Sequence, residues 1–341
     1  MTSIAKNFKI ESVIIEGIVR SKKILVIAAG AIFIFVGAFF LYSYFPKTAL
    51  RVLERNYLGY YFWTLEAENN LARERIKIEN VSMPQIDVSE GSGYAEADKK
   101  RIDWIRDNAD VAIVSSDELL LMEKEYPGVF KGVIFFSETK EEYMSNIVIK
   151  NNSTLSGVGS LSGKSIAVKN ETEGFLLEHF LKNNKATNYS LKRYTADEWA
   201  EKLATDKIDA ALITEPQGTQ FIQEKVVKEL IENPVGTGSF AGTPTYAVIV
   251  RTSLSKKDQR RMENYVDLLV ESIKIDDNRL REIMADHLGE GWAEVVAARK
   301  FARVQNYTEV DRALLQQMAD DMEQEGFVNF KLDISGAIYG Q

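Results

Sequence analysis

Polar residues stand directly after three short apolar runs of this chain, where they could bond a ligand. The residues at these points are Ser115, Ser116, Asn170, Glu171, Thr172 and Glu215. Their hydroxyls and carboxylates, together with the backbone amides at a helix start, can all bond a small molecule. In an open α/β sheet, ligands bind just outside the carboxyl ends of the strands. The sequence therefore predicts a ligand-binding cleft built from these segments.

Each of these residues also has an ordinary structural role. A serine at 115 or 116 is a common cap for a helix that begins at the next residue. Asn170 has Glu173 three residues later, which is the spacing of a capping box, so we expect Glu173 to serve the helix start. For Glu215, ligand contact and structural hydrogen bonding remain equal alternatives.

Strand-like and helix-like segments alternate from residue 48 onward, which predicts an α/β protein with a largely parallel sheet covered on both faces. The pattern starts again near residue 146, in a second α/β unit. The expected strands are 48–53, 76–81, 110–114, 146–149, 165–169, 190–194, 210–214 and 246–250, and the expected helices are 60–72, 95–108, 117–126, 171–183 and 197–205. A long helical region is expected over 256–325.

An uncharged apolar run of 22 residues, 24–45, precedes these units. At about 1.5 Å per residue it matches a hydrocarbon core of about 30 Å, so we expect one transmembrane helix. A buried core helix and a cleaved signal peptide are the alternatives, but 23 residues precede the run and no Ala-x-Ala site follows it. Lysine and arginine are more frequent before the run than after it. This bias favours a single pass through the cytoplasmic membrane, with the segment 1–23 inside and the C-terminal domain in the periplasm or outside.

The composition excludes several classes of function. The net charge is −8 with no basic stripe, which argues against a nucleic-acid partner. The chain has no cysteine, so disulfides, thiolate catalysis and cysteine metal sites are excluded. Its two histidines, His179 and His287, lie within helical patterns with no His-x-x-x-His pair, and there is no Gly-x-Ser-x-Gly elbow. We therefore expect no enzyme activity, no cofactor and no metal.

Four segments of this chain are similar to segments of one family. They are ADVAIVSSDELL (109–120), LSGKSIAVKNETEGFLLEHFL (161–181), KIDAALITEPQGTQF (207–221) and RALLQQMADDMEQEGF (312–327). Their order and spacing resemble type II periplasmic binding proteins, in particular the substrate-binding proteins of ABC importers for sulfonates, nitrate and thiamine precursors.

The resemblance implies two α/β lobes with doubly wound sheets, joined by two crossing strands near 144–149 and 243–250. Residues 46–147 and 246–341 would form the first lobe with the C-terminal helices, and residues 148–245 the second lobe. A ligand would bind between the lobes, which close about a hinge.

The resemblance also adds ligand-binding candidates. Tyr57, Tyr60 and Tyr61 lie where the family has its first binding loop and first helix, although some of these rings are expected to be core. Thr243 flanks the second crossing. The sequence departs from the family at Thr214, where a tryptophan is usual, and in the first loop, which lacks the usual proline or histidine.

The charge of the strand-end loops bears on the ligand. They contain no lysine or arginine apart from Lys169, whereas Glu171 and Glu215 lie in them. A sulfonate or nitrate would therefore lack neutralising partners. This pattern favours a neutral or cationic, nitrogen-containing small molecule.

The expected function is that of a membrane-anchored solute-binding protein. It would capture a small molecule between the lobes and present it to the permease of an ABC importer. The alternative is a binding-protein domain recruited as a sensor or as a structural subunit of a membrane complex, without a transported ligand.

Overall fold

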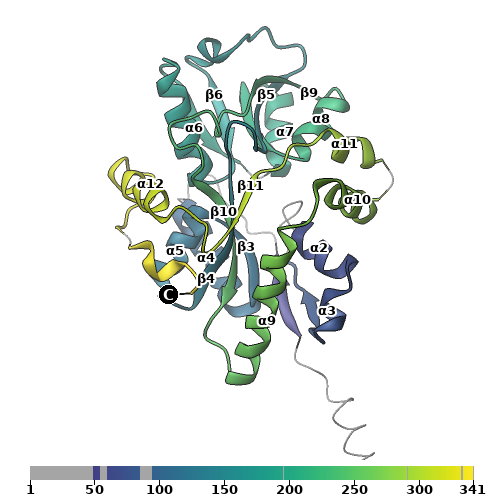
Figure 1. Ribbon diagram of the computed structural model, residues 1–341. Coiled ribbons are helices and arrows are strands. Elements are labelled where there is room, and N and C mark those ends of the chain that lie inside the picture. Colours follow the sequence, from purple (N-terminus) through teal and green to yellow (C-terminus); the bar gives the residue numbers. More distant parts are fainter. Residues whose placement is uncertain are drawn as a thin grey trace, which may run out of the picture. The chain divides into compact units, whose positions relative to one another are not determined.

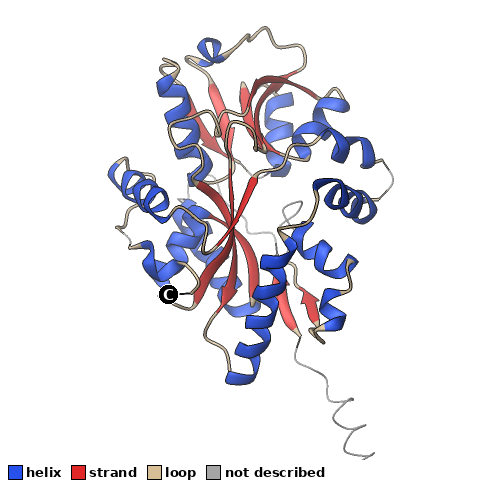
Figure 2. Cartoon of the chain, in the orientation of Figure 1, coloured by secondary structure: helices blue, strands red, loops and turns tan. Residues whose placement is uncertain are grey.

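The computed structural model describes residues 49–53, 60–84, 94–194, 196–289, 291–331 and 333–340. The expected cytoplasmic segment 1–23, the expected span 24–45 and Tyr57 lie outside these residues. Within them, none of the helices has the length and apolar character that crossing a membrane requires. The chain from Ala49 onward forms one unit, built on two sheets (Figures 1 and 2).

The first sheet has six strands in the order β11-β4-β10-β3-β1-β2. Their bounds are β1 (Leu50–Leu53), β2 (Ile78–Asn80), β3 (Val111–Ser115), β4 (Phe130–Ser137), β10 (Pro244–Arg251) and β11 (Arg303–Asn306). β1 pairs in parallel with β2 and β3, whereas β10 is antiparallel to β3 and β4.

The second sheet has five strands in the order β7-β6-β8-β5-β9. Their bounds are β5 (Ser145–Lys150), β6 (Ser165–Val168), β7 (Ser190–Arg193), β8 (Ala210–Thr214) and β9 (Val227–Glu232). β6 is parallel to β7 and β8, and β5 is antiparallel to β8 and β9. All five residues of β8 are buried, as they are in β3, because both faces of these strands are covered.

Two crossings join the sheets (Figure 1). The chain leaves the first sheet after Ser137 and enters the second at Ser145, and it returns between Glu232 and Pro244. The lobe boundaries expected at 147 and 246 lie within a few residues of these crossings. We call the region where the two sheet-centred lobes meet the seam.

Helices cover the sheets (Figure 2). Their bounds are α2 (Tyr60–Ala67), α3 (Asn70–Arg73), α4 (Tyr94–Asn108), α5 (Ser116–Glu125), α6 (Glu171–Asn183), α7 (Ala196–Ala204), α8 (Gln217–Gln223), α9 (Lys256–Ser272), α10 (Asp277–Leu288), α11 (Ala293–Ala298) and α12 (Arg312–Gln324), with short 3-10 turns η2 (Val158–Leu161) and η3 (Ile334–Ala337). The helix expected at 171–183 is confirmed to the residue. Asn170 caps it by accepting a hydrogen bond from the Glu173 backbone amide at 2.8 Å.

Several expectations about the elements are wrong. The helix expected over 60–72 is two helices, α2 and α3, with Asn69 at φ 55° between them, and strand β4 was not expected. The sheets are mixed rather than largely parallel, because β5 and β10 start at the seam and run opposite to the strands that end there. The region 256–325 is not continuously helical. Asp276 caps a new helix start, Gly289 at φ 90° ends α10, and β11 follows as an edge strand that is recognised only by its pairing with β4.

Candidate functional site

The starts of α5 and α6 meet face to face across the seam. The Asp117 backbone amide donates to Thr172 Oγ1 at 2.9 Å, and Thr172 Oγ1 donates to Asp117 Oδ1 at 2.7 Å. The Thr172 backbone amide also donates to Asp117 Oδ1, at 3.3 Å. The carboxylate of Asp117 thus occupies the amino terminus of α6, a position that favours an anion.

An ion pair beside this contact also joins the lobes. Arg193 in β7 donates to both carboxylate oxygens of Asp98 in α4, at 2.5 and 2.8 Å, and to Glu171 Oε1 at 3.3 Å. The Arg193 and Asp98 side chains are each 10% exposed. We call Asp98, Asp117, Thr172 and Arg193 the latch, because each contact joins one lobe to the other.

Burial sets the charges of the latch. It raises the pKa of the Asp117 carboxyl above its ordinary value, and the Glu118 carboxylate adds to this effect. Burial alone would lower the pKa of Arg193, but the hydrogen bonds and charge of Asp98 raise it above the ordinary value. The Arg193 guanidinium therefore stays charged over the physiological pH range.

The two predicted serines lie at this contact, and both form hydrogen bonds within the chain. Ser115 caps α5 in a capping box with Glu118, whose carboxylate accepts from the Ser115 backbone amide at 2.8 Å. Ser116 Oγ donates to the Pro244 carbonyl at 2.7 Å. Both side chains are fully buried. The hydroxyls that could have bonded a ligand are engaged within the chain.

Asn170 and Glu173 form a further contact with the first lobe. Tyr246 in β10 donates to Glu173 Oε1 at 2.7 Å, and Asn170 Nδ2 donates to the Tyr246 hydroxyl at 3.3 Å. The Lys169 backbone amide donates to Glu173 Oε2. Hydrogen bonds therefore join the start of α6 to the start of β10, where the second crossing ends.

Glu215 directly follows β8 and is engaged in structural hydrogen bonds. Its carboxylate accepts from Asn146 Nδ2 at 2.9 Å and from the Thr219 backbone amide at 3.1 Å. Thr243, at the second crossing, is fully buried, and its hydroxyl has no hydrogen-bond partner within the described part of the chain.

Tyr60 and Tyr61 are both core residues at the start of α2, 0% and 5% exposed. Their ring centroids lie 4.6 Å apart, and both rings contact Phe136 at the end of β4. Burial raises the pKa of Tyr60 to about 12, so its phenol stays neutral. The hydroxyl lies close to that of Tyr61 but makes no well-aligned hydrogen bond among the described residues.

Arg299, which the sequence analysis did not single out, lies against Tyr60. Its guanidinium carbon is 4.9 Å from the centre of the Tyr60 ring and 5.2 Å from that of Phe301. The side chain is fully buried, and burial lowers its pKa against the opposing effects of Tyr60 and Glu215. In the sequence, Arg299 is marked only by Phe301 two residues later, and this spacing is too common to identify a site.

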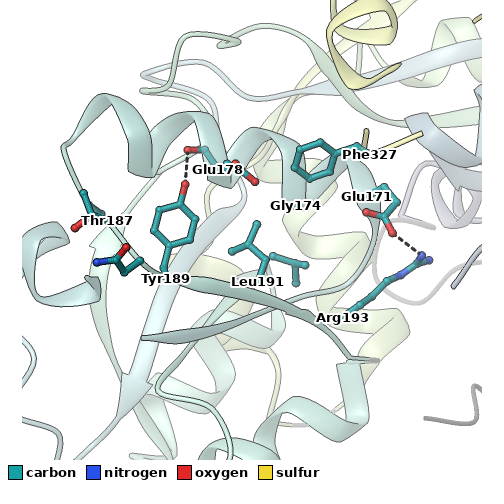
Figure 3. Close-up of a pocket in the computed structure, with 11 residues that line it drawn as sticks. Glu171, Gly174, Glu178, Thr187, Tyr189, Leu191, Arg193 and Phe327 are labelled. Atoms are coloured by element: carbon teal, nitrogen blue, oxygen red, sulfur yellow. Dashed lines mark hydrogen bonds and ion pairs between the residues drawn. The ribbon is translucent and has the colours of Figure 1, made fainter. Parts of the chain in front are cut away.

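A separate surface hollow of about 740 Å³ lies on the second lobe (Figure 3). Tyr189 and Leu191 of the β7 segment face Gly174 and Glu178 of α6 across it, and Phe327 closes one side. Glu171 and the latch residue Arg193 line one end of the hollow. Among the described residues, no group of three or more acidic or histidine side chains is placed to hold a metal.

Solved structures of binding proteins share this architecture. The periplasmic aliphatic sulphonate binding protein SsuA of Escherichia coli has 15% identity and a TM-score of 0.63, with 86% of this chain and 92% of that chain covered. The ligand-binding component of an ABC-type import system from Staphylococcus aureus, solved with zinc bound, has 13% identity and a TM-score of 0.65, with 86% and 96% covered.

An enzyme shares the architecture as well. DszB, solved as a mutant in complex with biphenyl-2-sulfinic acid, has 12% identity and a TM-score of 0.57, with 85% of this chain and 96% of that chain covered. No protein-family model matches the sequence, and no curated protein matches it. Identities this low show the fold alone, so function has to be argued from the site. The described part of this chain has the two-lobed α/β fold of the periplasmic binding proteins, with two mixed sheets.

Proposed function

We propose that this chain is an extracytoplasmic solute-binding protein that captures a small molecule between its two lobes. The observation that supports this proposal is the arrangement of the seam. Two crossings join the sheets there, and two helices that follow strand ends, α5 and α6, start facing each other. In binding proteins such a hinge lets a ligand favour the closed form over the open one.

The proposal includes a membrane anchor and an importer. Residues 24–45 would hold the protein at the cytoplasmic membrane with its lobes outside, and the closed lobes would deliver the solute to a permease. Protease added to intact spheroplasts should then remove the C-terminal part while leaving residues 1–23 protected. Protection of the whole chain would contradict this topology.

Ligand binding is tested with the full chain in detergent. A solute that binds only the folded protein increases the free energy of unfolding by RT ln(1 + [L]/Kd) and so raises the melting temperature. We expect at least one compound of a metabolite library, spanning anions, neutral molecules and cations, to give a concentration-dependent rise. If no compound of the library raises the melting temperature, the solute-binding proposal is contradicted.

The latch favours a second candidate, a lobe pair recruited as a sensor or structural subunit. Side chains of this chain occupy the α5–α6 contact and tie the lobes together without a guest. Because the chain has no cysteine, Lys185→Cys and Lys257→Cys can carry a fluorescent donor and acceptor on exposed positions of the two lobes. Transfer efficiency that changes with solute supports capture, whereas a constant value with every solute supports the structural role.

A further inference from the structure

The hollow on the second lobe has a carboxylate at each end of one wall. That wall is α6, which contributes Glu171, Gly174 and Glu178 (Figure 3). These residues are three and four positions apart, so they lie on one face of the helix. At about 1.5 Å per residue, positions 171 and 178 are about 10 Å apart along the helix axis. The two glutamate side chains are 30% and 26% exposed, so an incoming cation can reach both.

The other walls of the hollow are largely apolar. Tyr189 and Leu191 face α6, and Phe327 closes one side (Figure 3). All three side chains are half-buried. The Phe327 ring packs edge-on against Phe175, with ring centroids 5.5 Å apart. The volume of about 740 Å³ lies within the usual range of small-molecule sites. A hydrocarbon chain in the hollow would bury apolar surface on these rings, which favours binding.

Gly174 leaves the middle of the α6 wall without a side chain. Glycine is less favourable than alanine within a helix. The nearest atom to an added Cβ, outside the backbone of α6, would be Phe327 Cε1 at 3.5 Å, followed by Val168 Cγ2 at 3.7 Å. Both are ordinary contact distances, so packing does not require a glycine here. Its consequence is open space over the helix between the two glutamates.

Carboxylates outnumber cations at the end of the hollow beside the latch. Glu171 lies among Asp98, Asp117 and Arg193, so three carboxylates surround one guanidinium. Arg193 places its two shortest hydrogen bonds on Asp98 and a longer one, 3.3 Å, on Glu171. Burial and the two neighbouring aspartates raise the pKa of Glu171. A further positive charge at this end would therefore be stabilised.

The opposite end also has more carboxylates than lysine or arginine side chains. Glu178 and Glu325 both pair with Lys182, at 2.8 and 3.0 Å, and His179 contacts Glu325 at 2.9 Å. Lys182 and Glu325 line an adjoining smaller hollow that shares Glu178 with the larger one. The two ends of the hollow thus each complement a cation, and the space between them complements a hydrocarbon chain.

We infer that this hollow binds a linear aliphatic diamine, with its methylene chain over Gly174 and its two ammonium groups paired with Glu171 and Glu178. A single amine would leave one carboxylate end without its cation, and an uncharged chain would leave both. The site lies outside the seam, and it does not depend on the solute-binding function proposed above.

The first test compares four probes with the full chain in detergent at matched ionic strength: 1,5-diaminopentane, pentylamine, pentane-1,5-diol and glutarate. We expect the diamine to raise the melting temperature in a concentration-dependent way. Pentylamine should bind about fivefold more weakly, because it lacks one partly exposed ion pair. The diol and glutarate should give no rise. Absence of a rise with the diamine, or an equal rise with the diol or glutarate, overturns the inference.

Gly174→Ala places the diamine in the hollow or elsewhere. Without probe, the variant should melt at or above the wild-type temperature, because alanine favours the helix. The diamine should nevertheless bind about tenfold more weakly, since the added methyl group occupies the place of its chain. Gly159→Ala is the control, because an added Cβ there meets no atom within 4 Å and lies outside the hollow. Equal diamine affinity in wild type and Gly174→Ala contradicts the site.

A double variant covers the case in which Gly174→Ala does not fold. Glu171→Gln with Glu178→Gln keeps the size of both side chains and removes both charges, so the diamine should bind no better than pentane-1,5-diol. The matched control is Glu201→Gln with Glu224→Gln, two exposed positions of the second lobe that do not line the hollow. This control should bind like wild type. If both double variants lose the diamine alike, the binding reflects net charge alone and the inference falls.

Discussion

The latch and the surroundings of Arg299, formed by Tyr60 and Phe301, treat their polar groups in opposite ways. In the latch, Arg193 has two carboxylate partners and Asp117 accepts from both the hydroxyl and the amide of Thr172. Around Arg299, its two edge nitrogens, Nε and Nη2, and the Tyr60 hydroxyl bond none of the described residues. Buried polar atoms are normally paired, so such orphaned groups need an explanation.

The difference shows that only one of the two places uses a buried guanidinium to join the lobes. Paired charges at the latch favour contact between the lobes even without a guest. The edge nitrogens of Arg299 make no such contribution, because they bond none of the described residues. Substitutions in the latch and at the crossings between the sheets should test this difference.

Asp98→Ala should have the largest effect on stability. It removes the main partner of a nearly buried guanidinium, and truncating one side of a buried pair costs about 3–5 kcal/mol. Glu171 and the Lys169 carbonyl remain as acceptors for Arg193, so we expect about 3 kcal/mol by chemical denaturation of the full chain. The matched control is Asp206→Ala, which breaks an exposed pair with Lys150 and should cost under about 1 kcal/mol. Equal losses in the two variants would show that the latch does not hold the lobes.

Glu138 should make the first crossing sensitive to pH. It lies at the start of this crossing and is fully buried, with hydrogen bonds from the backbone of Met144 and Ser145 and from the Ser145 hydroxyl. Burial raises its pKa from 4.5 to about 7, against these hydrogen bonds. The native state then binds the proton more tightly than the unfolded state, so stability falls as pH rises from about 4.5 to 7.

The measurement compares wild type with Glu138→Gln across this pH range. The glutamine oxygen can accept the same hydrogen bonds but does not titrate. The wild-type free energy of unfolding should drop relative to the variant by about 3 kcal/mol between pH 4.5 and 7.5, since one pKa unit corresponds to about 1.4 kcal/mol. Raised pKa values at Asp117 and Glu171 affect both proteins alike and cancel. Parallel curves would contradict the assignment.

Thr172→Val should loosen the α5–α6 contact. The change keeps the shape of the side chain but removes the hydroxyl that bonds Asp117 in both directions. Leaving a buried carboxylate and amide short of partners costs about 2 kcal/mol. Hydrogen exchange should also quicken at the first amides of α5 and α6. Thr205→Val, where an exposed hydroxyl bonds the Glu201 carbonyl, is the control and should change stability by less than about 0.5 kcal/mol.

Tyr246→Phe should have the smallest effect. It removes the hydrogen bond to Glu173, whose carboxylate keeps the Lys169 backbone amide, and the long bond from Asn170. We expect a loss of about 1 kcal/mol in the free energy of unfolding. Tyr189→Phe, in which the lost bond to the Glu178 carbonyl is 3.4 Å long, should be nearly neutral. A larger loss for Tyr189 than for Tyr246 would place the stabilising contact on the second-lobe surface instead of the seam.

Local chemistry made much of the architecture predictable. The buried strands β3 and β8 appear as uninterrupted apolar runs, and α6 is bounded by the Asn170 cap. The expected strands did not include β4, β9 or β11. β9 and β11 each pair with one neighbouring strand and carry a partly exposed, mixed sequence. β4, in contrast, is a buried and largely apolar run that its own sequence could have identified. A pairing partner more than a hundred residues away, as for β11 and β4, leaves no periodic signal in the strand itself.

The points at which strands end in polar residues, and the helices that follow them, can be predicted from the amino-acid order, since these features depend on neighbours along the chain. The role of each polar residue depends instead on the packing of distant segments. Ser115 and Ser116 are turned to internal hydrogen bonds, Asp117 fills the start of α6, and Arg299 arrives beside Tyr60 with one edge free. The reason is physical: a polar group becomes a cap, a latch or a ligand site according to which partners the packing of distant segments brings within bonding distance, and whether any remain after the lobes meet.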